Sequence, residues 1–253
     1  MQRKLYSLIT GLFIGLVSSG GTVSAATCDL TTAGSSCTIN GAIFQQIDPQ
    51  STGTGVINSF VEVGGNTDTI SAYNTTANGV LNNGSSDQFN HALLVSELPV
   101  VTIGGVNYYQ FLLDVNQTGS DPLLSLNQLQ IFTSTTPNQS GSTVSGTLVY
   151  DLGANVVELN YSLNTGSGSG DMFLLVPTSV FGGASGTTNV YLFSEFGIPN
   201  NNNDGFEEWA IVQSTCTNPL GCNPPNVPEP QALLLVGAGL VVVGAVSRKR
   251  LRR

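Results

Sequence analysis

The chain has 253 residues with sixteen acidic and seven basic side chains, and its formal net charge is −9. Every Lys and Arg lies within the first four or the last six residues, so residues 5–247 carry all the acidic side chains and no cationic residue other than His91. This distribution argues against nucleic acid and anionic substrates as partners, because the region lacks a basic surface to attract them.

Residues 1–25 have the pattern of a secretory signal peptide. Two basic residues precede an apolar run over 5–17, and the small residues that follow end in a Val-Ser-Ala leader-peptidase site. We expect cleavage after Ala25 or Ala26 and export of the remaining chain. An uncleaved membrane anchor is the alternative, but the apolar run is shorter than the roughly 20 residues that cross a bilayer.

Residues 26–215 are expected to form one acidic ectodomain, an all-β, antiparallel β-sandwich of jelly-roll-like type. Short alternating apolar runs are separated by Gly, Asn and Ser turns, and there is no convincing helical period before the tail. Strands are expected over 56–63, 91–101, 108–115, 144–152, 156–163, 172–176, 190–196 and 208–213. Clean alternation in 109–115 predicts one buried and one exposed face. The apolar phase shifts within 124–132, which predicts a bulge or tight turn near Asn127 and Gln128.

Four cysteines flank this domain in two close pairs, Cys28 with Cys37 and Cys216 with Cys222. An exported chain reaches an oxidising compartment, where such pairs form disulfides. Two local disulfides are the simplest assignment. Cross-pairing between the two ends of the domain stays open, because four cysteines allow three connectivities.

An acidic segment near the end of the domain is a candidate metal site. Asn200–Asp204 places oxygen ligands on a turn and Glu207 follows it, which suits calcium outside the cell. We therefore predict Asp204 and Glu207 as calcium ligands, and calcium as the one cofactor to consider. Residues that could complete the site from distant segments are Asp114, Asn116 and Asp171. The alternative is a solvated acidic turn with Trp209 packed in the core.

The chain after the domain has three parts. Residues 216–226 are rich in Pro and Asn and are expected to form an extended spacer. Residues 231–247 are expected to form one transmembrane helix, with the basic residues 248–253 in the cytoplasm by the positive-inside rule. A buried core helix is the alternative, but it would not account for five basic residues in the last six positions.

Val227-Pro228-Glu229-Pro230, the apolar span and the Arg-rich terminus, taken in that order, resemble the PEP-CTERM sorting signal. The resemblance implies that an exosortase-type transpeptidase in the inner membrane of Gram-negative bacteria recognises Pro228, Glu229 and Pro230. It also implies a transient anchor in that membrane, followed by processing that passes the ectodomain on to the cell surface or extracellular matrix. Proteins of this kind typically accompany exopolysaccharide production, so exopolysaccharide is an expected partner.

The ectodomain is also similar to a group of exported PEP-CTERM proteins without an established activity. The likeness rests on segments 109–117, 124–131, 166–172, 191–197 and 204–209. It implies a shared fold and leaves the function open.

Export and anchoring predict a non-enzymatic protein of the cell surface or extracellular matrix. The alternative is a secreted carbohydrate-binding module or glycan-active enzyme, which requires Trp209 and tyrosines such as Tyr108 or Tyr191 to line an exposed groove beside carboxylates. No catalytic residue is assigned, because the sequence singles out neither a carboxylate pair nor an activated nucleophile.

Overall fold

The computed structural model describes residues 25–47, 57–84, 88–166 and 170–212. Residues 1–24 of the predicted signal peptide, the predicted spacer 216–226 and the sorting anchor 227–253 lie outside these described residues. Within the described segments no helix has the length and apolar character to cross a membrane. The boundaries of the signal peptide, spacer and transmembrane helix therefore stay predictions.

The described chain consists almost entirely of β-strands joined by turns and three short 3-10 helices. The first strands are β1 (Thr27–Asp29), β2 (Ser36–Ile39), β3 (Ala42–Gln46), β4 (Ile57–Gly64), β5 (Ile70–Tyr73), β6 (Leu93–Leu94) and β7 (Val100–Ile103). They are followed by β8 (Val106–Asp114), β9 (Leu123–Ser134), β10 (Thr147–Asp151), β11 (Val156–Asn160), β12 (Met172–Pro177), β13 (Asn189–Phe196) and β14 (Phe206–Val212). The 3-10 helices are η1 (Val95–Glu97), η2 (Tyr161–Leu163) and η3 (Thr178–Phe181).

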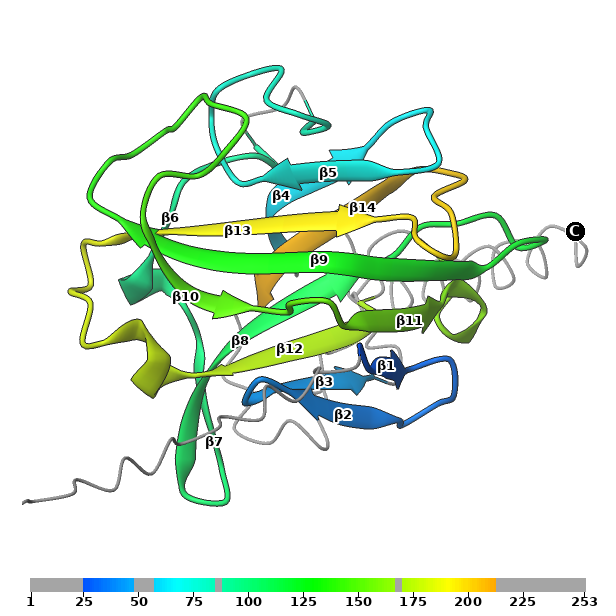
Figure 1. Cartoon of the computed structure of the whole chain (residues 1–253), viewed down its shortest axis with the longest axis horizontal. Coiled ribbons are helices and arrows are strands. Elements are labelled where there is room, and N and C mark those ends of the chain that lie inside the picture. The colour runs from blue at the N-terminus through cyan, green and yellow to red at the C-terminus, as the bar shows by residue number, and fades with distance from the viewer. Residues whose placement is uncertain (1–24, 48–56, 85–87, 167–169, 213–253) are drawn as a thin grey trace, which may run out of the picture.

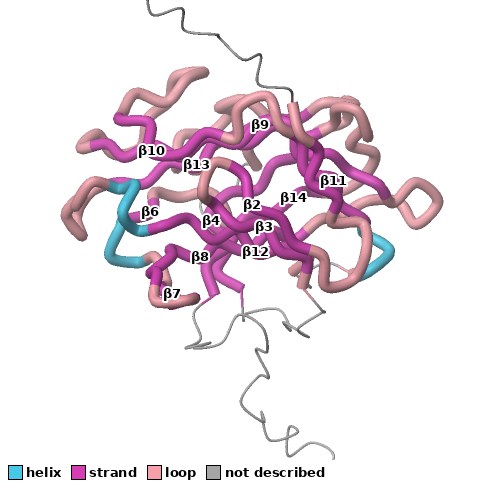
Figure 2. The backbone as a smooth tube through the Cα atoms, turned by 60° about the horizontal axis from the view of Figure 1, so that its bottom comes forward, coloured by secondary structure: helices cyan, strands magenta, loops and turns pink. Residues whose placement is uncertain are grey.

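The strands form two sheets that pack face to face. In sheet I the order is β1-β11-β9-β13-β5, with β10 added beside β9 and β6 beside β13. In sheet II the order is β2-β3-β12-β8-β14-β4, with β7 added beside β8. Figures 1 and 2 show β9, β10 and β13 in one layer and β3, β8 and β12 in the other. The predicted antiparallel β-sandwich is confirmed, with a parallel pairing of β1 and β11 as a local exception.

Strand positions match the predicted alternation best in the centre of the sheets and worst at the edges. The run 91–101 was expected to be one strand, but it divides into β6, η1 and β7. Pro99 lies between η1 and β7, and proline cannot donate a backbone hydrogen bond to a strand ladder. The prediction of one continuous strand was therefore wrong.

The bulge expected near Asn127 is present. In the pairing of β13 with β9, Glu195 lies opposite Gln128 while the next residue, Phe196, lies opposite Leu126. Asn127 is the extra residue, and its insertion lets β9 change phase.

The core between the sheets is apolar, and buried hydrogen bonds join the two sheets across it. Trp209 of β14 is fully buried, and its indole N–H donates to Ser194 Oγ of β13 at 3.0 Å. Phe60 and Phe111 meet edge to face, with ring centroids 6.2 Å apart. The predicted exposed face of β8 was wrong, because Leu112 is also buried, in a second apolar cluster.

A disulfide joins Cys28 of β1 to Cys37 of β2, with a Cα–Cα distance of 6.0 Å. Since β1 belongs to sheet I and β2 to sheet II, this bond connects the edges of the two layers. The local pairing predicted for these two cysteines is thus present. The other predicted pair, Cys216 and Cys222, lies outside the described residues.

Candidate functional site

The topology brings two turns that are far apart in sequence to the same end of the sandwich. β4 pairs with β14 so that Gly64 lies opposite Phe206, and β5 pairs with β13 so that Ile70 lies opposite Phe196. The connection from β4 to β5 and the connection from β13 to β14 both cross between the sheets. They must therefore run side by side.

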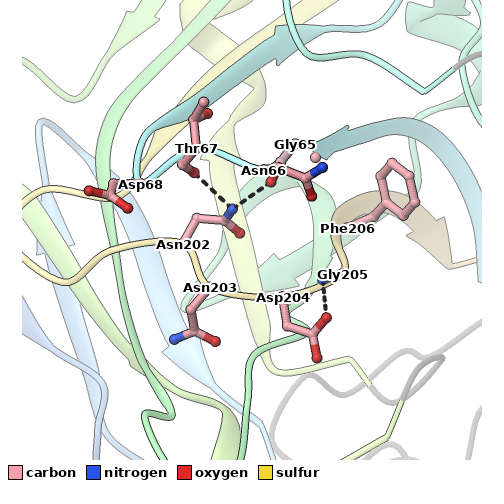
Figure 3. Close-up of a pocket in the computed structure, with 10 residues that line it drawn as sticks. Gly65, Asn66, Thr67, Asp68, Asn202, Asn203, Asp204, Gly205 and Phe206 are labelled. Carbon is pink, nitrogen blue, oxygen red and sulfur yellow. Dashed lines mark hydrogen bonds between the residues drawn. The ribbon is translucent and has the colours of Figure 1, made fainter.

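An open cleft of about 710 Å³ lies between these two connections (Figure 3). One wall is formed by residues 64–68 and the other by residues 202–206. The lining is rich in amides and carboxylates, because Asn66, Asp68, Asn203 and Asp204 all lie exposed along it. The cleft therefore offers hydrogen-bond donors and acceptors to a polar ligand, and its two charged side chains are both anionic.

Asn202 holds the two walls together. Its side chain is buried, and its Nδ2 donates to the carbonyl oxygens of Gly65 and Thr67, each at 3.1 Å. Its backbone N–H donates to the carbonyl oxygen of Asp68 at 2.9 Å. With three bonds from one residue, the width of the cleft is fixed before any ligand arrives.

Asn203 anchors the second wall to the loop that follows β8. Its Oδ1 accepts the backbone N–H of Thr118 at 2.8 Å, and its Nδ2 donates to the carbonyl oxygen of Asp121 at 2.7 Å. Asp204 is bonded more locally, since its Oδ1 accepts the N–H of Gly205 at 2.9 Å. Its second carboxylate oxygen is therefore available at the exposed surface of the cleft.

Phe206 places an aromatic ring on the rim of the cleft. The ring rests over Gly64, where an added Cβ would collide with it, so a larger residue at this position would displace the ring. Even so, 47 % of Phe206 is exposed. An exposed phenyl ring beside amides and carboxylates combines an apolar face with polar groups that fix orientation.

Glu207 points away from the cleft, into the sandwich. It is fully buried, and its Oε2 accepts the backbone N–H of Asn116 at 2.9 Å while its Oε1 accepts from Gln117 Nε2 at 2.5 Å. Burial raises the pKa of Glu207 well above its usual range, the two hydrogen bonds partly offset this rise, and the charges of Asp171 and Asp114 add to it. Consecutive strand residues face opposite sides, so Phe206 faces outward and Glu207 inward.

The structure thus separates the two predicted calcium ligands, because Asp204 lines the cleft and Glu207 does not. The residues expected to complete the site gather around Glu207 instead. Asn116 donates to it, and Asp114 and Asp171 act on it electrostatically. Among the described residues, no three His, Cys, Asp or Glu side chains are arranged to hold a metal ion. Calcium binding stays a prediction.

The aromatic residues expected to form a glycan-binding groove do not do so. Trp209 and Tyr191 are fully buried, and Tyr108 packs partly buried against the second apolar cluster on sheet II. That form of the carbohydrate-binding hypothesis is wrong. Packing of Trp209 in the core was expected for a solvated acidic turn, whereas the exposure of Phe206 depends on the strand starting two residues earlier than expected.

The residues that sequence reasoning missed are those of the first wall, 64–68. The Gly-Gly pair at its start and the Asn-rich run 200–205 both carried turn signals. Their adjacency had no sequence signal, because it depends on β4 pairing with β14 across most of the chain.

No characterised protein and no solved structure gives a significant match to the chain. The family model of the PEP-CTERM protein-sorting motif matches residues 226–250. This match includes Pro228, Glu229 and Pro230, whose individual roles in recognition stay predictions. The chain therefore carries a PEP-CTERM sorting signal, which makes it a membrane-anchored export substrate processed by an exosortase.

Proposed function

We propose that the exported domain is a non-catalytic module of the cell surface or extracellular matrix that binds a neutral polysaccharide in the cleft between residues 64–68 and 202–206. The observation that carries the proposal is the exposed ring of Phe206 on the rim of a cleft lined by amides and carboxylates. The sorting signal supports it, because a domain exported to the cell surface would meet such polymers there.

A sugar ring has an apolar face of C–H groups and a rim of hydroxyls. The phenyl ring of Phe206 suits the apolar face, and the exposed side chains of Asn66 and Asp204 can bond hydroxyls that act as donors and acceptors. The wall held by Asn202 is already in place, so little conformational entropy is lost on binding. A shallow, open and rigid cleft of this kind suits a chain-like ligand bound along the surface.

The charge of the cleft favours a neutral polymer over an acidic one. Asp68 and Asp204 line it, and no Lys or Arg occurs between residues 5 and 247 to offset them. An acidic polysaccharide would meet like charge at short range, which weakens binding and slows encounter.

The proposal is tested by affinity electrophoresis of the full-length chain in detergent, in gels that contain dextran, xylan or the acidic polymer alginate. We expect retardation by a neutral polymer, and the Phe206→Ala variant should lose about tenfold in affinity, as expected for one aromatic contact. The Leu148→Ala variant is the matched control, because Leu148 is 46 % exposed and belongs to β10, outside the cleft.

Two results would contradict the proposal. Equal retardation of wild type and Phe206→Ala would show that the polysaccharide does not bind in the cleft. Release of reducing ends from the same polymers, lost on Asp204→Asn, would make the domain an enzyme instead of a binding module.

A further inference from the structure

Four carboxyl groups lie in one line across four neighbouring strands of sheet II. Glu208 of β14 pairs in register with Asp114 of β8 on one side and with Glu62 of β4 on the other. Asp171 directly precedes β12, and its Oδ2 accepts the backbone N–H of Val115, at the end of β8, at 2.6 Å. We call Asp171, Asp114, Glu208 and Glu62 the acidic row.

The acidic row is shielded from solvent to different degrees. Asp114 and Asp171 are buried, with 3 % and 4 % of their surface exposed, and Glu62 and Glu208 are partly buried. Side chains directly opposite one another on neighbouring strands have Cβ atoms about 4.5–5.5 Å apart, and like charges in such pairs are destabilising. Four ionised carboxylates in this arrangement would strongly oppose folding.

The usual remedy for buried carboxylates, a neighbouring Lys or Arg, is absent from this part of the chain. All seven such residues lie within 1–4 and 248–253, outside the residues that the structure describes. Protons or bound cations are therefore left to neutralise the row.

The geometry of the row shows where a proton can be held. Glu62 and Glu208 lie directly opposite each other on paired strands, and two carboxyl groups placed in this way can hydrogen-bond to each other only if one of them carries a proton. In Asp171, the second oxygen, Oδ1, is buried and has no hydrogen-bond partner among the residues that the structure describes. An oxygen without a donor nearby is better suited to a neutral carboxyl group than to a carboxylate.

We propose that the acidic row keeps protons in the folded protein, which makes the exported domain a pH-responsive module that is most stable in mildly acidic surroundings and loosens as the pH rises past neutrality. The element that responds is the centre of sheet II, where β12, β8, β14 and β4 meet. The same strands β14 and β4 lead into the cleft, so loosening there reaches the cleft walls.

The pKa directions agree with this geometry. Burial raises the pKa of Glu62 to about 7, and the hydrogen bond and charge of Glu208 contribute to the rise. Burial also raises the pKa of Asp171 well above its usual range, the bond from Val115 opposes the rise, and the charge of Asp114 adds to it.

Few other titratable groups face the acidic row. Glu207 acts on Asp114 and Asp171 from the inner side of β14. On the β4 side, Ser59 Oγ donates to Glu208 Oε2 at 3.4 Å, and the carbonyl oxygen of Ser59 lies 3.2 Å from His91 Nε2. His91 is the one Lys, Arg or His among the described residues, and it contacts β4 through the Ser59 carbonyl oxygen.

The sign of the effect follows from proton linkage. A carboxyl group whose pKa is higher in the folded than in the unfolded chain binds protons preferentially in the folded state. Its stabilising contribution is complete below the unfolded value, 4.5 for Glu62, and is lost as the pH rises through about 7. Stability should therefore fall between pH 5 and pH 8.

The test is thermal unfolding of the full-length chain in detergent with EDTA at pH 5 and pH 8. We expect Tm to be lower at pH 8 by about 5–10 °C. The Glu62→Gln and Asp171→Asn variants keep the shape of each side chain without its charge, and each should reduce this difference. Asp121→Asn is the matched control, because Asp121 is exposed and outside the acidic row.

A Tm that is equal or higher at pH 8 would overturn the proposal, as would an unchanged pH dependence in both row variants. If Tm at pH 8 is lower with EDTA than with added calcium, a cation neutralises the acidic row in place of protons. If the variants fail to fold, infrared spectroscopy of the wild type at pH 6 decides. A protonated carboxyl band supports the proposal, and its absence refutes it.

Discussion

Replacing Glu207 by Ala should destabilise the domain strongly, because two buried donors lose their acceptor. The backbone N–H of Asn116 donates to Glu207 Oε2 at 2.9 Å and Gln117 Nε2 donates to Oε1 at 2.5 Å. A buried donor without a partner costs about 1–3 kcal/mol, so two cost about 2–6 kcal/mol. Loss of repulsion from Asp114 and Asp171 offsets part of this cost. We expect a net loss of about 2–4 kcal/mol in the free energy of unfolding.

The assay is urea unfolding at pH 6, followed by the fluorescence of the single tryptophan, Trp209, which is fully buried and reports directly on the core. Asp204→Ala is the control, three residues away in sequence but exposed, and it should change stability by less than about 1 kcal/mol. Equal losses in the two variants would refute this reasoning. If both losses occurred only with calcium present, Asp204 and Glu207 would share a metal site after all.

Three further predictions concern single contacts. Replacing Cys28 and Cys37 by Ser opens a short loop whose ends are separated by 9 in sequence, and should cost about 2.5 kcal/mol in urea unfolding by the chain-entropy relation; no change would show that the bond does not constrain the unfolded chain. Trp209→Phe removes the hydrogen bond to Ser194 and part of the side-chain volume in the core, so the free energy of unfolding should fall by about 2–3 kcal/mol, with a lower midpoint of thermal unfolding. Ser194→Ala, which removes the hydrogen bond alone, should lower the free energy of unfolding by less. Asn202→Ala removes the side-chain hydrogen bonds between the two cleft walls, so affinity for the polysaccharide, measured by gel retardation, should fall by more free energy than the stability of the domain does. Equal losses of binding and unfolding free energy would show that Asn202 serves the fold alone.

The sequence predicted the fold class because apolar alternation is strongest where both sheets contribute to the core. β8, β12 and β13 lie within a residue or two of their expected positions. The strands that were missed, β1, β2, β3 and β5, are three to five residues long and contain Thr, Ser, Gln and Cys in place of a clear apolar pattern. Such short strands, of which β1, β2 and β5 lie at sheet edges, are held by their neighbours more than by their own preference, so their pattern alone does not reveal them.

The candidate site was predicted in its parts but not in its assembly. Consecutive strand residues such as Glu207 and Glu208 must lie on opposite faces, but the direction of each depends on where β14 begins. The strand starts at Phe206, which turns Glu207 inward and leaves Asp204 in the cleft. Sequence spacing holds no information on the first wall, because residues 64–68 reach the cleft only through long-range strand pairing.

The composition of the domain explains both its hydrogen bonding and its dependence on protons. Carboxylates that would elsewhere pair with Lys or Arg are bonded here by amides and hydroxyls. Glu158 accepts from Ser125 and Asn200, and Glu195 accepts from Asn127 and Gln128. These donors satisfy the lone pairs of a carboxylate but bring no positive charge, so the charge itself remains. At the surface, water and salt screen that charge, whereas in the acidic row there is little solvent to do so. Neutral donors therefore stabilise individual carboxylates such as Glu158 and Glu195, but they do not remove the repulsion within the acidic row, which protons or cations must neutralise.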